Sequence, residues 1–226
     1  MYQIADKSDL PGIAALWSEA FGDSPEAVSR FFEAFPDCIS FVAREQGQIV
    51  SMVHALPQTL RAGADLPAAY VYAVATLQSH RGRGLCRELM AFAESDLTQR
   101  GFACAVLTPG EPSLFEFYRN LGYTSAFTRN RTACSGGTPI PAAEYLALRE
   151  RLLTGPHMVY NLRTLEYARQ VYGLTFYRTE TGIAAASREY TAEVLPEDLG
   201  GAPFAMVKWL DTPRPLKNAY LGFALE

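Results

Sequence analysis

Residues Gln78 to Leu89, QSHRGRGLCREL, combine cationic side chains with glycines where a helical pattern begins. Arg81 and Arg83 alternate with Gly82 and Gly84. The first turn of a helix has backbone N–H groups without an intrahelical partner and carries partial positive charge. Glycines let the backbone approach a phosphate closely, and the arginines add formal charge. The stretch predicts a pyrophosphate cradle, and the alternative is a solvated basic turn.

Other nucleotide-binding motifs do not account for this loop. The sequence has no GxxxxGK[ST] motif, so the loop is not a P-loop. Gly82-Arg83-Gly84 begins like GxGxxG, but Arg87 stands at the third glycine position, and residues 101–105 contain no acidic side chain. These differences exclude a dinucleotide-binding fold. Insertion of an RGR segment into a DNA minor groove uses a disordered arm, whereas this segment continues into an amphipathic helix.

Composition narrows the class of protein. The chain has 226 residues, of which 49% are hydrophobic, so it can bury a core of its own. Its formal net charge of -4 argues against a general binder of nucleic acid or anionic membranes. No run of about 18 apolar residues predicts a membrane span, and the first residues do not resemble a signal peptide. No metal site is expected. The four cysteines lack CxxC spacing, which predicts free thiols in the cytoplasm. They are Cys38, Cys86, Cys104 and Cys134.

The loop must be positioned by the elements around it. Residues 69–77 form an apolar, β-rich run that is typical of a strand covered on both faces, and the helix from Gly84 ends at Gly101. The other predicted elements of the first half are a strand over 1–4, helices beginning at Asp9 and after Ser24, a hairpin of strands 38–44 and 49–56, a strand over 102–107, a helix over 112–121 and a strand over 123–128.

A new pattern begins after Cys134-Ser135-Gly136-Gly137-Thr138-Pro139, which is typical of a linker. The expected elements are helices over 142–153 and 161–172, a hairpin of strands 175–178 and 183–190, and strands over 204–209 and 219–225. The sequence thus predicts two domains, 1–133 and 134–226.

Two motifs together resemble the GCN5-related N-acetyltransferase (GNAT) family. They are Val74–Gly84, which runs from a strand into the loop, and Phe117–Tyr123, FYRNLGY. The resemblance covers residues 1 to about 128 and is greatest to a bacterial branch with a second, partial acetyltransferase-like domain. It implies an α+β fold with a splayed, mixed central β-sheet flanked by helices, and a smaller C-terminal α+β half-domain. Ser79 departs from the usual Gln or Arg, and residues 66–69 lack the carboxylate of histone-acetylating members.

The resemblance implies acetyl-CoA as cosubstrate and a primary amine of a small molecule or peptide as acceptor. The amine would attack the thioester directly, without a covalent enzyme intermediate. The main chain of the strand would bind the pantetheine arm, and the loop would bind the pyrophosphate. The cofactor-binding residues would be Val74, Ala75, Thr76, Ser79, His80, Arg81, Gly82, Arg83 and Gly84.

Tyr118 matches the family's acid tyrosine, and the alternative is an aromatic core residue at helical spacing. The base is open between His54, Glu111, the terminal carboxylate of Glu226 and water. His54 could instead be a hydrogen-bonded strand histidine, and Tyr70 and Tyr72 share one strand face, either lining the acceptor cleft or packing under a helix. The C-terminal half would set substrate choice or form a homodimer interface. A non-catalytic acetyl-CoA sensor is the alternative to an enzyme.

Overall fold

The computed structural model describes residues 1–129, 133–134, 136–196, 204–216 and 219–222. The chain divides into two compact units. The first comprises Met1–Pro57, Pro67–Leu107 and Lys208–Pro213, and the second comprises Gln58–Leu66, Thr108–Val207 and Arg214–Glu226. The predicted boundary after residue 133 falls within the second unit's range, and the domain assignment of 1–133 and 134–226 stays a prediction.

The sheet of the first unit begins with three antiparallel strands. β1 (Tyr2–Ile4) pairs with β2 (Ile39–Glu45), and β2 pairs with β3 (Gln48–Arg61). The β2–β3 hairpin turns at Gln46 and Gly47, whose φ angles are 48° and 84°. Positive φ at both central residues is the geometry that matches the twist of a two-residue hairpin, and glycine adopts it without a steric penalty.

β4 (Asp65–Thr76) lies beside β3, and its pairing with β5 (Cys104–Leu107) covers only part of its length. The parallel register runs from Ala68 opposite Cys104 to Tyr70 opposite Val106. β4 then continues through Ala73, which has a positive φ of 47°, to Thr76. The segment Val74–Thr76 therefore lies beyond the paired part of the two strands, as a splayed sheet requires.

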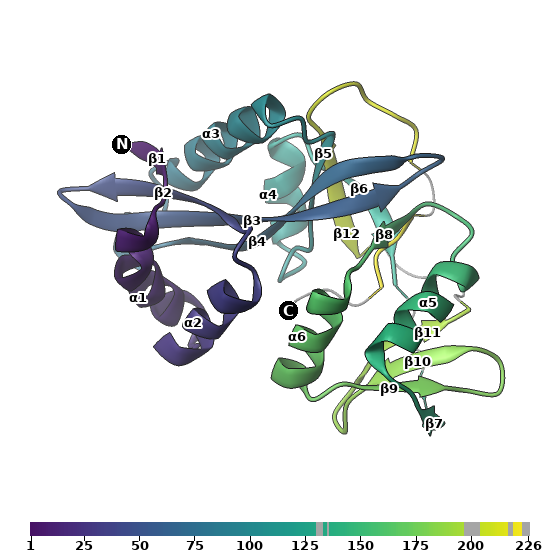
Figure 1. Ribbon diagram of the computed structural model, residues 1–226. Helices are drawn as coiled ribbons and strands as arrows, with labels where there is room; N and C mark the ends of the chain where they lie inside the picture. Colours follow the sequence, from purple (N-terminus) through teal and green to yellow (C-terminus); the bar gives the residue numbers. More distant parts are fainter. Residues whose placement is uncertain (130–132, 135, 197–203, 217–218, 223–226) are drawn as a thin grey trace. The chain divides into compact units, whose positions relative to one another are not determined.

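Helices cover both faces of the first unit's sheet. α1 (Leu10–Phe21) and α2 (Pro25–Ala34) lie on one face, and α3 (Leu85–Gln99) lies on the other (Figure 1). The Ser24 hydroxyl accepts a hydrogen bond from the Ala27 N–H at 3.3 Å, which caps α2 before a proline at its first position. Short 3₁₀ turns at Lys7–Asp9 and Gln78–His80 precede α1 and α3.

The second unit contains strands from distant parts of the chain. β12 (Ala205–Trp209) runs antiparallel to β6 (Thr124–Thr128), and β13 (Ala219–Tyr220) runs parallel to β6 and β8 (His157–Val159). A separate sheet has the order β11 (Thr191–Leu195), β10 (Ile183–Ala186), β9 (Thr175–Arg178) and β7 (Thr138–Pro139). The helices are α4 (Leu114–Asn120), α5 (Ala142–Leu152) and α6 (Leu162–Tyr172).

Two predictions for the second half were wrong in detail. The strand expected over 183–190 is two strands, β10 and β11, because the Ser187 hydroxyl accepts hydrogen bonds from the Glu189 and Tyr190 N–H groups and stabilises a turn between them. The expected linker contains β7, and a Cβ atom at Gly137 would lie 2.3 Å from the Arg178 carbonyl oxygen. β8 was not expected at all. The predicted strand 219–225 is confirmed only as β13, and residues 223–225 lie outside the described part.

The fold class is confirmed. Mixed parallel and antiparallel strands are flanked by helices in the first unit, and the helices and strands predicted there all occur. β3 and β4 are longer than expected, since β3 continues to Arg61 and β4 begins at Asp65.

Candidate functional site

The end of β4 is held firmly on its β3 side. The buried Ser51 hydroxyl donates to the Ala75 carbonyl oxygen at 2.9 Å and lies 2.8 Å from Thr76 Oγ1. The Leu77 N–H donates to the Val50 carbonyl oxygen at 2.9 Å. Because these bonds all come from β3, they fix the strand that leads into the loop without using the edge that β5 has left.

The loop after β4 takes its shape from two glycines on either side of Arg83. Gly82 and Gly84 have φ angles of 76° and 82°, a region that side-chain-bearing residues rarely adopt. Gly84 is the N-cap of α3, and no side chain caps the helix there. The first N–H groups of α3 are therefore available to a bound anion in the way that helix N-termini generally are.

The cationic side chains of the loop are engaged in different ways. The Arg81 guanidinium folds back, and its Nε donates to the Thr76 carbonyl oxygen at 3.1 Å. Arg83 extends to Glu45 at the end of β2, with Nη2 2.8 and 3.0 Å from the two carboxylate oxygens. His80 Nε2 lies 3.6 Å from the same carboxylate, and His80 Nδ1 is 2.8 Å from the Ser79 hydroxyl. All residues predicted from Ser79 to Gly84 thus form one continuous surface turn.

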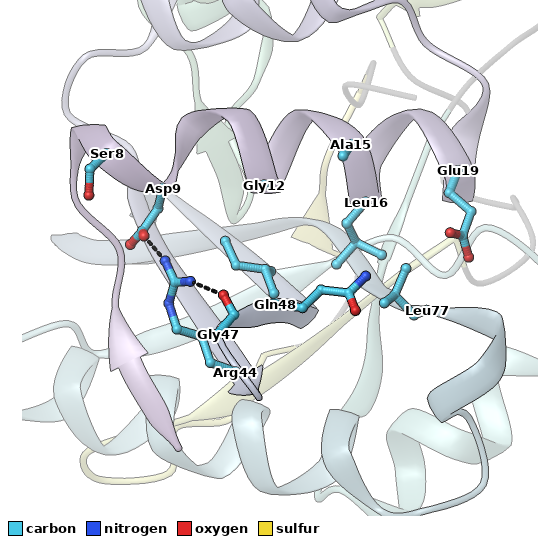
Figure 2. A pocket seen from close by; sticks show the side chains of 11 residues that line it. Ser8, Asp9, Gly12, Ala15, Leu16, Glu19, Arg44, Gly47, Gln48 and Leu77 are labelled. Carbon is cyan, nitrogen blue, oxygen red and sulfur yellow. Dashed lines mark hydrogen bonds and ion pairs between the residues drawn. The ribbon is translucent and has the colours of Figure 1, made fainter.

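A pocket of about 310 Å³ lies beside the start of this loop, between α1 and the β2–β3 hairpin (Figure 2). Leu77 lines it, and the Glu19 carboxylate accepts the Gln78 N–H at 3.2 Å. Arg44 bridges the hairpin to α1, because it donates to the Gly47 carbonyl oxygen at 2.8 Å and forms an ion pair with the buried Asp9. The pocket's polar groups thus fix the loop and the hairpin from one side.

Tyr118 lies on α4 in the second unit. Its side chain is 7% exposed and is in edge contact with the rings of Phe117 and Tyr123, at centroid distances of 5.2 and 5.8 Å. The Tyr118 carbonyl oxygen accepts the N–H groups of Leu121 and Tyr123, which ends the helix. The tyrosine is therefore a packed residue of fixed orientation, and its assignment as the acid stays a prediction.

His54 is a packed strand histidine. It is fully buried, Nδ1 lies 2.8 Å from the Ser40 hydroxyl, and the ring lies 5.1 Å from Trp17. Burial lowers the pKa of His54 to about 3. An imidazole of such low basicity is a poor acceptor for the proton of an alkylamine, whose pKa is near 10.4. Of the two alternatives for His54, the structure favours the hydrogen-bonded one.

The remaining candidates for a base are placed differently. Glu111 is exposed and accepts a hydrogen bond from the Ser113 hydroxyl at 3.3 Å, while its carbonyl oxygen accepts the Leu114 N–H at the start of α4. Glu226 lies outside the described residues. Tyr70 and Tyr72 do share a face, with stacked rings 6.5 Å apart, and Tyr72 packs on Trp17 and Phe31 under the helices α1 and α2.

The cysteines are free thiols, and two of them have raised pKa values. Burial raises the pKa of Cys38 to about 12 and that of Cys86 to about 11. Within the described residues, no group of three or more His, Cys, Asp or Glu side chains is arranged to hold a metal ion. None of the described helices has both the length and the apolar character needed to cross a membrane.

Sequence reasoning missed the residues that support the loop from elsewhere in the chain. Glu45 was assigned to a hairpin turn, and neither Ser51 nor Glu19 was singled out. Successive side chains of β2 point to opposite faces of the sheet, so Glu45 lies on the face opposite to Arg44, which contacts the start of α1. That alternation is the signal that would have directed Glu45 toward the α3 side, where Arg83 lies just before the N-cap residue Gly84.

A strand that outruns its parallel neighbour, followed by a glycine-rich cationic loop at a helix N-terminus, is the arrangement of an acetyltransferase fold. The model of the acetyltransferase (GNAT) domain matches residues 2–126. The chain belongs to the GNAT acetyltransferase family.

Relatives of known sequence support this assignment over part of the chain. The chain is 33% identical over 110 residues to YhbS, an uncharacterized N-acetyltransferase of Escherichia coli K12. The match covers 47% of this chain and 65% of YhbS. The chain thus spans a little less than two thirds of the curated relatives it matches.

Solved structures resemble the fold over a longer stretch. A conserved protein of unknown function from Enterococcus faecalis V583, described as a probable N-acyltransferase, covers 93% of this chain with a TM-score of 0.71 at 17% identity, and 73% of that protein is matched. Eis1 from Mycobacterium abscessus covers 82% with a TM-score of 0.63 at 13% identity, and 53% of Eis1 is matched. At such low identity these similarities concern the fold alone.

Proposed function

We propose that this protein is an acetyl-CoA-dependent N-acetyltransferase that acts on a primary amine of a small molecule or peptide. The observation that carries the proposal is the loop Ser79–Gly84, an uncapped helix N-terminus with flanking arginines, in a chain of the GNAT family. The loop's N–H groups would hold the pyrophosphate, and the main chain of Val74, Ala75 and Thr76 would hold the pantetheine arm.

The reaction is a direct transfer. The neutral amine nitrogen attacks the thioester carbonyl carbon, a C–N bond forms, and the C–S bond breaks with its electron pair leaving on sulfur. The amine loses one proton and the thiolate gains one. Because an alkylammonium has a pKa near 10.4 and a thiol near 8.5, both proton transfers assist the reaction at neutral pH.

Tyr118 is proposed as the acid that protonates the departing thiolate. A phenol keeps its proton at pH 7 and can donate it to a sulfur that gains negative charge. The rings of Phe117 and Tyr123 restrict its motion, which favours a fixed donor over a mobile one. His54 is not proposed as the base, and Glu111, Glu226 and a water molecule are the alternatives for that role.

The second unit is proposed to determine which amine is accepted, and a homodimer interface is its alternative role. Its titratable residues in the described part are mostly engaged in ion pairs or hydrogen bonds, such as Arg178 with Glu144 at 2.6 Å and Arg169 with Glu166 at 2.7 Å. The free cysteines fit a reducing compartment, so we propose the cytoplasm.

An assay of thiol release tests the proposal. Purified protein is incubated with acetyl-CoA and a panel of polyamines, aminoglycosides and amino-acid amides, and free coenzyme A is measured. We expect at least one amine to raise thiol release well above background hydrolysis, with a matching acetylated product by mass spectrometry. Tight acetyl-CoA binding without amine-dependent release across a broad panel would favour the sensor instead.

A further inference from the structure

The arginine Arg83 of the loop is paired with a carboxylate of the protein itself. Glu45, at the end of β2, directs both carboxylate oxygens at Arg83 Nη2, at 2.8 and 3.0 Å, and lies 3.6 Å from His80 Nε2. The Arg83 guanidinium and the His80 imidazole, two side chains of the proposed phosphate cradle, therefore face one carboxylate. We propose that Glu45 is an internal counter-anion, which occupies Arg83 in the free protein and is displaced by the phosphates of coenzyme A.

Glu45 is held in place independently of the loop. Its strand ends in the tight hairpin turn at Gln46 and Gly47, and it pairs with Gln48 across that turn. On the opposite face, Arg44 donates to the Gly47 carbonyl oxygen and pairs with Asp9 of the adjoining turn (Figure 2). The carboxylate is thus presented from a braced hairpin.

Arg83 is placed so that it can change partner. It lies between two glycines of positive φ, and its side chain is 50% exposed, compared with 32% for Glu45. An ion pair with this exposure is weak, because water screens both charges. The Glu45 carboxylate contacts the guanidinium through Nη2 alone. The phosphates of coenzyme A offer more negative charge and can accept from two guanidinium nitrogens, so exchange from carboxylate to phosphate is favourable.

Glu88, another carboxylate near the loop, is differently engaged. Its Oε2 accepts the Tyr2 hydroxyl, and its Oε1 would lie 3.8 Å from a Cβ atom at Gly84. Burial and the hydrogen bond to Glu88 raise the pKa of Tyr2 to about 12, so the phenol stays a donor. Glu88 is thus bound to β1, whereas Glu45 is bound to the loop's own arginine.

The consequence is that Glu45 determines how tightly coenzyme A is held. This inference rests on the proposed function, since it requires a ligand with phosphates in the loop. Removing the carboxylate charge should tighten coenzyme A binding, and it should leave pantetheine, which lacks the phosphates, unaffected. A residue that merely orients Arg83 for the ligand would give the opposite sign, a loss of affinity on substitution.

The test is calorimetry of coenzyme A and pantetheine with four proteins: wild type, Glu45→Gln, Arg83→Gln and the double variant. We expect E45Q to tighten coenzyme A by about two- to fivefold at about 0.1 M salt, where the screening length is about 10 Å. In the R83Q background, E45Q should change the affinity for coenzyme A by a factor close to one, because the effect of each side chain depends on the other. Asp96→Asn is the matched control, since it removes one charge about 18 Å along α3 from Gly84, beyond the screening length.

The outcomes separate the two proposals. An E45Q affinity for coenzyme A that is unchanged or weaker would overturn the role of Glu45 and leave the proposed function standing. The same gain in the R83Q background, or in D96N, would show a general charge effect and would also overturn it. If the folded wild-type protein bound no coenzyme A, the proposed function itself would be wrong.

Discussion

Two of the molecule's arginine–glutamate pairs differ sharply in their exposure to solvent. Arg83 and Glu45 of the first unit are 50% and 32% exposed, whereas Arg149 and Glu193 of the second unit are both fully buried. The first pair joins a loop to a hairpin, and the second joins helix α5 to strand β11. The difference lies in what can replace each partner: a solvent-borne anion can reach Arg83, and none can reach Arg149.

The buried pair is satisfied completely from within the second unit. Arg149 Nε lies 3.1 and 3.2 Å from the two Glu193 oxygens, and its other nitrogens donate to the carbonyl oxygens of Met158 and Leu221. Tyr145 donates to the same carboxylate, and burial, followed by the charge of Glu193, raises the pKa of Tyr145 well above its usual value. The cluster ties the segment Ala219–Gly222 to α5 and β8.

Gly222 shows how closely the chain approaches this cluster. A Cβ atom there would lie 2.0 Å from Glu193 Oε1, and its φ angle is 81°. Tyr160 adds a second donor to the Leu221 carbonyl oxygen at 2.8 Å. All three guanidinium nitrogens of Arg149 donate hydrogen bonds. A fully buried charge pair of this kind holds its segments in place, because any rearrangement would leave a charge without a partner.

The largest expected effect breaks the buried pair. Arg149→Met should lower the free energy of unfolding by about 3–5 kcal/mol, because it leaves the Glu193 carboxylate buried without its cation. Urea unfolding followed by circular dichroism measures the change. Arg83→Met is the matched substitution in the exposed pair and should cost less than about 1 kcal/mol. Adding Glu193→Gln to R149M should recover part of the loss, and equal costs at Arg149 and Arg83 would refute the comparison.

The second prediction concerns the buried Tyr118, and whether it contributes to catalysis or only to packing. Tyr118→Phe keeps the ring and removes the proposed acid, so kcat should fall by up to about a hundredfold, while coenzyme A affinity hardly changes. Tyr123→Phe is the matched control, since its ring lies 5.8 Å from Tyr118 and it has no assigned role. A fall in kcat of less than about threefold in folded Y118F would make Tyr118 a core residue.

The third prediction concerns the charge at the N-cap of α3, in the exposed loop. Gly84→Asp places a negative charge at the N-cap of α3 and should weaken coenzyme A binding by about tenfold or more. Gly84→Asn is its control, because Asn and Asp both tolerate a left-handed backbone and differ in charge. Calorimetry on both variants isolates the charge. If G84N lost as much affinity as G84D, backbone strain and not the phosphate cradle would explain the effect.

Sequence reasoning succeeded where the signals are contiguous. The loop 79–84, the strand before it and the helix after it are adjacent in the chain, and glycine and N-terminal helix patterns depend only on neighbours. The Ser24 cap and the glycine after α3 were found for the same reason. The family motif around Tyr118 predicts an acid where periodicity alone would assign a core residue, and that assignment stays a prediction.

The parts that could not be predicted depend on pairing between distant segments. β8 is three residues long and is recognisable only beside β13 and β3. The bonds from Ser51 to Ala75 and from Glu45 to Arg83 join residues 24 and 38 positions apart. The apolar alanines 184–186 read as a continuing strand, whereas the turn at Ser187 is fixed by side-chain hydrogen bonds that a pattern of hydrophobicity does not contain.

The most direct test of the central claim, that the loop after β4 holds the phosphates of coenzyme A, is calorimetry of the wild-type protein with coenzyme A and pantetheine at low and high salt. The account predicts that coenzyme A binds about tenfold more tightly or better, and that this advantage shrinks as salt screens the loop's charges. Equal affinities for the two ligands at low salt, or an advantage that salt does not change, would contradict it.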